Sequence, residues 1–512
     1  MNKLHDVIIV GAGPVGLLLA CELGLAGMSV LVLERDAAPE SPGKIQPFGF
    51  RGLHASSIEI LNRRGLLDKF FDPSERPHSP PKAEGGFMFG GHFAGIMLNI
   101  HKLDLTRHKY RLTGPSLMPA RTTIEQIETV LTERAESLGV KILRGHGFDH
   151  IVQEDENGVT VEAGGSGKHF NARWLVGCDG GRSRVRKAAG FEFDGTEATL
   201  TGYSLRCDID HPEKLEMGFN PSENGFYIFS PWGMFSLMDF DGGAGQTQEL
   251  TQERMQDVLE RVVGRTDVHI TKLHLASGWT DRCKQTTNLH KGRVLLAGDA
   301  AHIHPPFGAQ GMNTGLGDAM NLGWKLAATI RREKREGGLS SFKLLATYEK
   351  ERHPIATSVL DWARAQAATM QPTPTGRALR ALANDLIMTD DGVNHFIDRV
   401  WGLSQRYLLG DNEHPLVGRS APDFTFEDGS RLNPKLTKGR GLLLDFKKDE
   451  ALKAAIQLDE YKGLIDYLDG NVQSRLGISA LLIRCDGFVA WVAEESLQPD
   501  IAKLQDVLNM WF

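Results

Sequence analysis

Cysteine is scarce in this chain of 512 residues. The five cysteines are scattered, and no two of them form a Cys-x-x-Cys pair: Cys21, Cys178, Cys207, Cys283 and Cys485. This spacing argues against a disulfide framework and against a cysteine-based zinc site. It favours a reducing compartment, and we expect a cytoplasmic protein.

An excess of positive charge is also missing. The chain has 58 Lys and Arg against 65 Asp and Glu, a net charge of −7, so no global basic field attracts nucleic acid or an anionic membrane. The most apolar stretch, residues 7–33, is interrupted by Glu22 and by glycines. Its pattern is strand, turn, helix, strand, which argues against a membrane span and against a signal peptide.

A glycine-rich turn near the N-terminus is the most informative feature that is present. An apolar run of strand length, residues 7–10, ends at Gly11, and Gly13 and Gly16 follow before a helix-forming run. In a dinucleotide-binding turn the first glycine allows the tight turn, and the second lets the backbone approach a pyrophosphate. The third lets helix and strand pack closely, and the N–H groups at the helix start attract phosphates.

The next apolar run supports this interpretation. Residues 30–33 end at Glu34, about twenty residues after the first glycine, where a carboxylate would accept hydrogen bonds from ribose hydroxyls. The two runs and the turn together predict a βαβ unit that binds a dinucleotide. The alternative is an ordinary buried strand–helix corner, and the motif alone does not distinguish NAD from FAD.

A second segment with binding chemistry lies near residue 300. An apolar strand at 293–297 places Asp299 at its C-terminal end, where ligands bind in open α/β sheets and where a carboxylate can hold a polyol chain. Pro305 and Pro306 stiffen the following turn. Residues 311–313 then open a helix whose unpaired N–H groups would stabilise a ring that becomes anionic on reduction, by about 0.3–2 kcal/mol.

The rest of the chain is long enough for several structural units and, with 41% apolar residues, is not disordered by default. Residues 200–280 alternate short apolar runs with Gly, Pro and Asn turns, which predicts an antiparallel sheet with one helix near 251–263. A separate unit begins at about residue 415. Other expected elements are helices within 52–65, 121–138, 311–335 and 342–368, a Pro-rich connection over 72–86, a hairpin over 87–98, and strands at 441–446, 480–484 and 488–491.

Four motifs resemble those of one enzyme family. They are Gly11 to Gly16; Cys178-Asp179-Gly180-Gly181-Arg182-Ser183; Gly298-Asp299-Ala300-Ala301-His302 with Gly311-Met312-Asn313-Thr314-Gly315; and Tyr348 to Pro354. On these motifs the chain resembles the FAD-dependent aromatic hydroxylases, the single-component (group A) flavoprotein monooxygenases. The C-terminal unit resembles the thioredoxin-like extension of the branch that includes phenol hydroxylases and the polyketide and antibiotic hydroxylases of secondary metabolism.

The resemblance implies an α/β fold with four parts. These are a Rossmann-like FAD-binding domain (1–75, 105–185 and 281–345), an inserted antiparallel-sheet substrate-binding domain (76–104 and 186–280), a helical segment (346–410) and a thioredoxin-like C-terminal domain (415–512). The last part lacks a Cys-x-x-Cys pair, so we expect a structural or dimer-supporting module without thiol–disulfide chemistry. Both a monomer and a homodimer remain open.

The resemblance also implies an FAD site. Its expected residues are Gly11, Gly13, Pro14, Val15, Gly16, Glu34, Arg35, Arg121, Asp179, Asp299, Gly311, Met312 and Asn313. Within this set, Glu34 and Arg35 would meet the ribose and pyrophosphate, and Asp299 the ribityl chain. Arg121 would sit at the start of a helix, against the flavin. Relatives often have an arginine in the loop after the second strand, and either Lys44 or Arg51 could take its place.

The implied reaction uses NAD(P)H and O₂ as co-substrates and a flavin C4a-hydroperoxide to hydroxylate a phenolic or polycyclic aromatic ring. Pro305, Gly311 and Met312 would position the flavin, and the sequence identifies no side-chain base. Phe226, Phe235 and Pro306 are candidate substrate contacts, although for any single aromatic residue a place in the sheet core is the favoured alternative.

Several alternatives remain open. The same flavin chemistry could give Baeyer–Villiger insertion or epoxidation, and the chain could be a non-catalytic FAD-binding partner that sequesters an intermediate. The Trp-x-Trp-x-Ile-Pro motif of flavin halogenases is absent. His302 and His304 are not accompanied by Cys, Asp or Glu at metal-ligand spacing, so no metal is expected.

Overall fold

A computed structural model describes residues 4–75, 86–165, 167–230, 233–336, 343–410 and 414–512. Its largest sheet has a parallel core with the strand order β19-β10-β1-β2-β7, built from β1 (Leu4–Val10), β2 (Val30–Leu33), β7 (Lys141–Leu143), β10 (His169–Gly177) and β19 (Val294–Leu296). Three antiparallel strands extend it: β8 (Phe148–Asp155), β9 (Gly158–Ala163) and β18 (His290–Lys291).

Helices cover the parallel strands, which explains why residues 7–10 of β1 form a continuous apolar run. Residues 7–10 of β1 are all buried, as is most of α1 (Pro14–Leu25). The helix α1 packs between α4 (Ile124–Ser137) and α7 (Gln310–Glu336). The predicted βαβ unit is therefore confirmed as β1–α1–β2.

A second, five-stranded sheet is antiparallel throughout, as predicted. Its order is β13-β14-β15-β12-β16, from β12 (Thr201–Ile209), β13 (Gly218–Pro221), β14 (Gly225–Phe229), β15 (Met234–Asp239) and β16 (Ile270–Thr280). The predicted helix, α6 (Gln252–Val263), covers one face. The other face packs towards the hairpin of β4 (Phe89–Phe93) and β5 (Ile96–Asn99).

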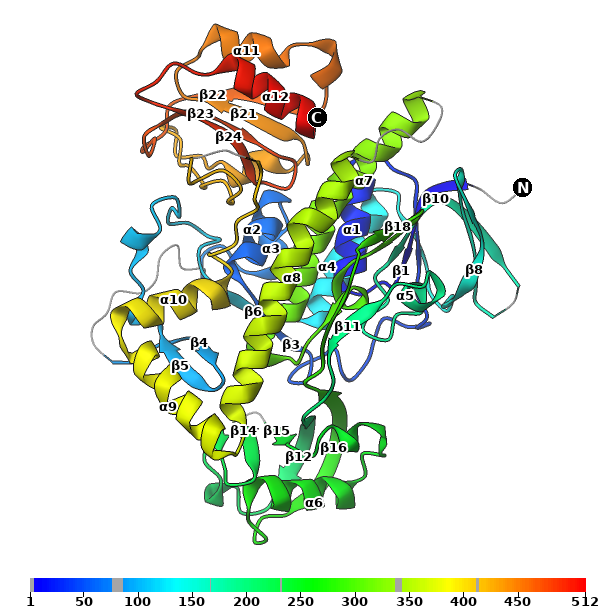
Figure 1. The fold of residues 1–512 in the computed structure, drawn as a ribbon, viewed down its shortest axis with the longest axis vertical. Coiled ribbons are helices and arrows are strands. Elements are labelled where there is room, and N and C mark those ends of the chain that lie inside the picture. Colours follow the sequence, from blue (N-terminus) through cyan, green and yellow to red (C-terminus); the bar gives the residue numbers. More distant parts are fainter. Residues whose placement is uncertain (1–3, 76–85, 166, 231–232, 337–342, 411–413) are drawn as a thin grey trace.

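Two long helices connect the parts of the molecule. The helices α7 and α8 (Lys343–Met370) lie side by side, and α8 runs from the C-terminal unit past the large sheet to the five-stranded sheet (Figure 1). The remaining helices are α2 (Ala55–Arg63), α3 (Leu67–Phe70), α5 (Arg184–Ala188), α9 (Pro374–Met388) and α10 (Asp390–Trp401). Small sheets are formed by β3 (Phe50–Leu53) with β6 (Ala120–Thr123), and by β11 (Phe193–Thr196), β17 (Cys283–Thr286) and β20 (His302–Ile303).

The C-terminal unit has a four-stranded sheet in the order β22-β21-β23-β24. Its elements are β21 (Gly441–Asp445), β22 (Ile465–Asp469), β23 (Ile478–Ile483), β24 (Val489–Glu494), α11 (Glu450–Ile456) and α12 (Ile501–Trp511). The strands predicted at 480–484 and 488–491 are confirmed as β23 and β24, which pair antiparallel, whereas β22, which pairs parallel to β21, was not predicted. Its sequence, Ile-Asp-Tyr-Leu-Asp, is too polar to predict a core strand.

Four other expectations need correction or stay open. Arg121 lies on β6 and not at a helix start, because Thr123 caps α4 by accepting a hydrogen bond from the Gln126 N–H at 3.1 Å. Residues 50–53 pair with β6 as a strand, so the helix expected within 52–65 begins at Ala55. Most of the Pro-rich connection, residues 76–85, lies outside the described residues. The proposed domain limits remain a prediction.

Across the described ranges, no helix is both long enough and apolar enough to cross a lipid bilayer.

A buried charge cluster joins the C-terminal unit to the two long helices. Arg484, in the turn after β23, donates to both carboxylate oxygens of Glu351 on α8 at 2.8 and 2.9 Å, and to Asp486. Lys325 on α7 lies 2.9 Å from the same Glu351 carboxylate, and the side chains of all four residues are at most 3% exposed. Burial alone would raise the pKa of Glu351, but the two cations outweigh it and lower that pKa to about 2. Burial lowers the pKa of Lys325 to about 7.

We predict that Arg484→Met destabilises the protein by about 3–5 kcal/mol, because it leaves Glu351 and Asp486 buried with one fewer cation. Methionine keeps apolar bulk beside Trp511, whose ring lies 4.4 Å from the Arg484 guanidinium. The matched control is Arg475→Met, which removes a half-exposed pair with Glu495 at 3.1 Å and should cost at most about 1 kcal/mol. Urea unfolding followed by circular dichroism measures both, and equal losses in the two variants would contradict the prediction.

Candidate functional site

A groove of about 360 Å³ lies where the three motif segments meet. It is lined by Gly13, Pro14, Val15, Arg51, Gly52, Ile124, Cys178, Gly180, Ala297, Asp299, His304, Pro306, Ala309, Gln310, Gly311 and Met312. The turn after β1, the segment after β10 and the loop between β19 and α7 thus converge, although nearly 300 residues separate the first from the last.

The glycine turn has the close contacts that its sequence predicted. Gly11 has φ +105°, and a Cβ there would lie 2.4 Å from the Cys178 carbonyl oxygen. A Cβ on Gly16 would lie 2.0 Å from the carbonyl oxygen of Gly11, so helix and turn pack too closely for any side chain. Gly13 differs, because a Cβ there would meet nothing within 4 Å. Gly13 therefore borders open space in the groove.

Two carboxylates expected at the FAD site are used inside the chain. Glu34 accepts hydrogen bonds from the N–H groups of Ala12 at 2.7 Å and of Asp36 at 2.8 Å, so its carboxylate holds the glycine turn. Asp179 accepts from the Ser183 hydroxyl and from the Arg184 N–H at 2.7 Å, at the start of α5. Neither is among the described residues that line the groove.

Two predicted basic contacts also lie elsewhere. The side chain of Arg35 is 82% exposed and pairs with the neighbouring Asp36 at 3.2 Å. Arg121, on β6, is exposed and is not among the described residues that line the groove. The placement of these two side chains does not support direct cofactor contacts in this conformation.

Arg51 is the basic residue that the structure brings into the groove. Its guanidinium donates to the carbonyl oxygens of Phe50 at 2.7 Å and of Phe48 at 3.2 Å. Both Arg51 and Asp299 line the groove. Burial lowers the pKa of Arg51, and the charge of Asp299 partly opposes this effect. Lys44, the other candidate from the sequence, pairs with Glu128 at 2.8 Å.

The start of α7 is fixed by Asn313. Its side-chain oxygen accepts from the His54 N–H and the Ser57 hydroxyl, and its amide donates to the carbonyls of Gly52 and Ala309, at 2.6–2.9 Å. All of its hydrogen-bonding capacity is thereby used on the chain. Asn313 therefore positions the helix, and the preceding residues, Gly311 and Met312, line the groove in its place.

His304 is a groove residue whose role the sequence did not reveal. Its Nδ1 lies 2.8 Å from the Pro305 carbonyl oxygen and so carries the proton, which leaves Nε2 of the neutral ring as an acceptor. That Nε2 is buried without a hydrogen-bond partner among the described residues, and it lies 3.3 Å from where a Cβ on Gly311 would be. Burial lowers the pKa of His304, which favours the neutral ring.

A chain of buried ion pairs supports the loop behind the groove. Asp318 on α7 accepts hydrogen bonds from the Gly298 N–H at 3.0 Å, from His302 at 2.8 Å and from Arg352 at 2.7 Å. Burial by itself would raise the pKa of Asp318, but Arg352 and His302 lower it overall. The described part of the chain has no group of three His, Cys, Asp or Glu residues that could hold a metal ion.

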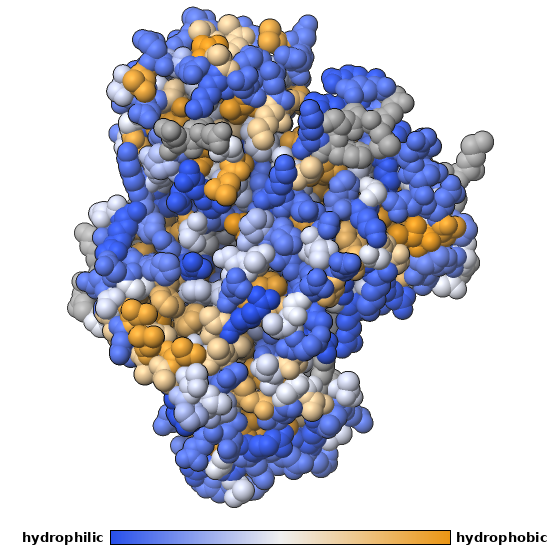
Figure 2. Space-filling model, in the orientation of Figure 1, coloured by the Kyte–Doolittle hydropathy of each residue, from blue (hydrophilic) through white to orange (hydrophobic). Residues whose placement is uncertain are grey.

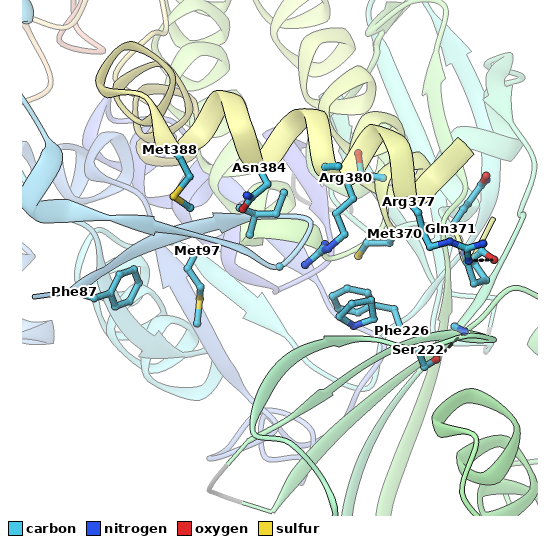
Figure 3. Close-up of a pocket in the computed structure, with 17 residues that line it drawn as sticks. Phe87, Met97, Ser222, Phe226, Met370, Gln371, Arg377, Arg380, Asn384 and Met388 are labelled. Atoms are coloured by element: carbon cyan, nitrogen blue, oxygen red, sulfur yellow. Dashed lines mark hydrogen bonds between the residues drawn. The ribbon is translucent and has the colours of Figure 1, made fainter. Parts of the chain in front are cut away.

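A larger cavity of about 820 Å³ lies between α9, the β4–β5 hairpin and the edge of the five-stranded sheet (Figure 3). Phe226 lines this cavity, and Pro306 lines the groove. Phe235 is different, because it is fully buried with Met255 and Leu259 of α6. Phe226 of β14 pairs with Met238 of β15 and shares its face of the sheet. Phe235 lies three residues before Met238 on β15, and because side chains alternate along a strand, it points to the opposite face. The expectation that Phe235 contacts substrate is therefore not supported by its position.

These features fit a flavin dinucleotide. The groove offers open space at Gly13, the N–H groups of a long helix at Gly311 and Met312, and a buried acceptor on His304 that no described residue satisfies. Arg51 and Asp299 supply opposite charges on its walls.

Comparison with known proteins agrees with this geometry. Residues 5–363 match the family model described as "FAD binding domain", and residues 414–512 match "Aromatic-ring hydroxylase, C-terminal". A Claviceps purpurea protein named "Monoogygenase" is 47% identical over 99% of this chain and 97% of its own length. Rifampicin monooxygenase of Streptomyces venezuelae is 36% identical over 96% of both chains.

A solved structure, OxyS anhydrotetracycline hydroxylase from Streptomyces rimosus, superposes with a TM-score of 0.84 at 34% identity, over 100% of this chain and 99% of that chain. The likeness extends over the full length, including the C-terminal unit. The chain therefore belongs to the family of FAD-dependent aromatic hydroxylases.

Proposed function

We propose that this protein is an NAD(P)H-dependent monooxygenase that hydroxylates a phenolic or polycyclic aromatic substrate with O₂. The observation that carries the proposal is the placement of the FAD groove beside a large apolar region. Phe307, next to Pro306 of the groove, belongs to the same hydrophobic cluster as Phe226, which lines the 820 Å³ cavity. A flat aromatic molecule would lie between them.

The substrates named for the relatives support an aromatic ligand of several rings. The relatives reported above act on rifampicin and on anhydrotetracycline, and a cavity of about 820 Å³ falls in the range of sites for compounds of that size. We therefore place the reaction in secondary metabolism and in the cytoplasm. A monomer and a homodimer both remain compatible with this function.

The groove residues would hold the cofactor at three points. The open space at Gly13 and the start of α1 would receive the pyrophosphate, with Arg51 adding a positive charge. Asp299 would accept hydrogen bonds from a polyol chain. The first N–H groups of α7, at Gly311 and Met312, would stabilise negative charge on a reduced ring. When bound, the flavin supplies the electron transfer to O₂ that side chains cannot perform.

The protein residues would position the substrate and exclude water from it. Phe307 and Trp279 pack edge to face, with ring centroids 5.6 Å apart, and keep water from the substrate side of the groove. His304 presents an unprotonated Nε2 that can accept a hydrogen bond from a donor at the groove. No described residue is assigned as the base that deprotonates a phenol.

The direct test is turnover. Purified protein should be yellow or reconstitute with FAD, and an aromatic substrate should accelerate NADH or NADPH oxidation above the rate without substrate. In ¹⁸O₂ the hydroxylated product should gain 2 mass units relative to ¹⁶O₂. Oxygen inserted into a ring bond or across a double bond would instead indicate Baeyer–Villiger or epoxidation chemistry. Bound FAD without turnover of any phenol in a broad panel would contradict the proposal and favour a sequestering partner.

The two central glycines of the turn should fail in different ways. Gly13→Ala should fold normally, since φ is −78° and a Cβ has free space, but it should weaken FAD binding at least tenfold because that Cβ occupies the proposed pyrophosphate site. Gly16→Ala should lower the thermal midpoint of the FAD-free protein, because its Cβ overlaps the Gly11 carbonyl oxygen. FAD titration and thermal melting of the FAD-free protein measure the two effects. Unchanged FAD affinity in Gly13→Ala would show that the pyrophosphate does not bind at this turn.

Arg51 and Lys44 form a second matched pair. Arg51→Gln should weaken FAD binding about tenfold to a hundredfold, because a charge-assisted hydrogen bond contributes about 1.5–3 kcal/mol. Lys44→Gln should leave FAD affinity within about twofold of wild type, since Lys44 pairs with Glu128 outside the groove. Fluorescence quenching of free FAD measures both constants, and the reverse order would show that the loop is arranged differently around the cofactor.

A further inference from the structure

The 820 Å³ cavity combines apolar walls with two arginines. Its walls include Phe226 from β14, Met97 from β5 and Met370 from the end of α8, while Arg377 and Arg380 come from α9. Figure 3 shows Arg380 extending from α9 towards Phe226, with Arg377 one turn earlier on the same side. None of the described residues that line this cavity is acidic.

Among the described residues, no carboxylate pairs with Arg380 to balance its charge. It is partly buried, one Nη atom donates to the Ala94 carbonyl oxygen at 2.5 Å, and the guanidinium lies 5.5 Å from the Phe226 ring centroid. Burial lowers the pKa of Arg380, and no carboxylate opposes this effect. Within the described ranges it forms no ion pair. Its remaining N–H donors are available to a ligand.

Arg377 adds a second guanidinium to the same wall. Residues three apart lie on one side of a helix, so Arg377 and Arg380 can approach the same group. Arg377 donates to the Pro372 carbonyl oxygen at 3.3 Å, and the described part of the chain pairs it with no carboxylate. Other buried arginines in this protein do have such partners: Arg352 with Asp318 and Arg484 with Glu351, at 2.7–2.9 Å.

The rest of the cavity favours aromatic rings. Methionine sulfur contacts aromatic faces favourably, and Met97, Met370 and Met388 surround the space that Phe226 borders. A guanidinium can bind a carboxylate through two parallel N–H donors, which gives both affinity and orientation. A neutral ligand would leave the partly buried Arg380 without an anionic partner, whereas an aromatic anion would match both the apolar walls and the arginines.

We propose that this cavity selects an aromatic compound that carries an anionic group, such as a carboxylate, and that Arg377 and Arg380 bind this group. The inference rests on the proposed function in taking this compound to be the substrate. Phe226 lines the cavity and packs in the same buried cluster as Phe307 of the flavin loop, so rings that extend from the arginines to Phe226 would point towards that loop. The anionic end is then held away from the reacting ring and sets which ring carbon faces the cofactor.

The test compares two probes that have the same rings and differ in one sulfonate: 1-anilinonaphthalene-8-sulfonate and neutral N-phenyl-1-naphthylamine. Binding to the FAD-loaded protein is measured by isothermal titration calorimetry, without NAD(P)H. Wild type should bind the sulfonate at least tenfold more tightly than the neutral probe. The double variant Arg377→Gln/Arg380→Gln should lose this preference and keep its affinity for the neutral probe within about twofold.

Three further variants keep the test decisive. The double lysine variant, Arg377→Lys/Arg380→Lys, should retain part of the preference, because the charge remains. Arg335→Gln, at the exposed end of α7, should bind both probes as wild type does. Arg377→Gln alone should reduce the preference severalfold, and this exposed position avoids the Ala94 contact of Arg380 if the double variant unfolds.

Equal affinity of wild type for the two probes would overturn the inference, as would equal losses for both probes in the glutamine variants. Failure of the proposed function gives a different result: no turnover of hydroxynaphthoates or their methyl esters, with the sulfonate preference intact. If the esters turn over as fast as the free acids at limiting concentration and the sulfonate preference is absent, the proposed oxygenase function stands and the proposed anion site is wrong.

Discussion

The buried carboxylate of Asp318 is the interaction on which the groove depends. It joins the Gly298 N–H, just after β19, and His302 of β20 to Arg352 on α8, with every partner within 3.0 Å. A buried carboxylate is costly unless its hydrogen bonds are complete, so this one tolerates few arrangements of its neighbours. The loop that carries Asp299 and His304 is therefore fixed from behind, by residues that a ligand in the groove would not touch.

The same helix transmits this constraint to the C-terminal unit. Glu351 is the residue before Arg352 on α8. Arg352 binds Asp318 behind the groove, and Glu351 binds Arg484 of the C-terminal unit. Arg352 also donates to the Tyr407 hydroxyl, and the Tyr407 ring lies against Phe488 of the C-terminal unit. Burial raises the pKa of Cys485 in that unit to about 12, so no reactive thiolate forms there. The unit therefore contributes support to α8, consistent with the structural role expected from its lack of a Cys-x-x-Cys pair.

The sequence predicted the backbone of the site better than its side chains. The glycine spacing predicted the turn at Gly11, and the structure leaves no room for a Cβ at Gly11 or Gly16, where it would lie 2.0–2.4 Å from a carbonyl oxygen. Motif letters could not show whether a polar side chain faces the ligand or its own chain. Asp179 and Asn313 turn inward to hydrogen-bond backbone groups, whereas Arg51 reaches the groove from a segment without a clear motif. These choices depend on tertiary neighbours, which one sequence does not reveal.

The five-stranded sheet shows what further reasoning from the sequence could have achieved. In β14 the order Phe226-Tyr227-Ile228-Phe229 alternates between two faces, and α6 must cover one of them. The faces separate cleanly: Tyr227 and Phe229 pack with α6, and Phe226 and Ile228 pack with the cluster beside the flavin loop. Once one of these residues is assigned to a face of the sheet, the alternation of side chains along the strand assigns the others. The choice of face, however, needs the position of the loop at Phe307, more than 70 residues away in the sequence. Substrate contacts in such a fold are thus decided where the sheet meets the flavin loop, and the aromatic residues on the covered face maintain the sheet that presents them.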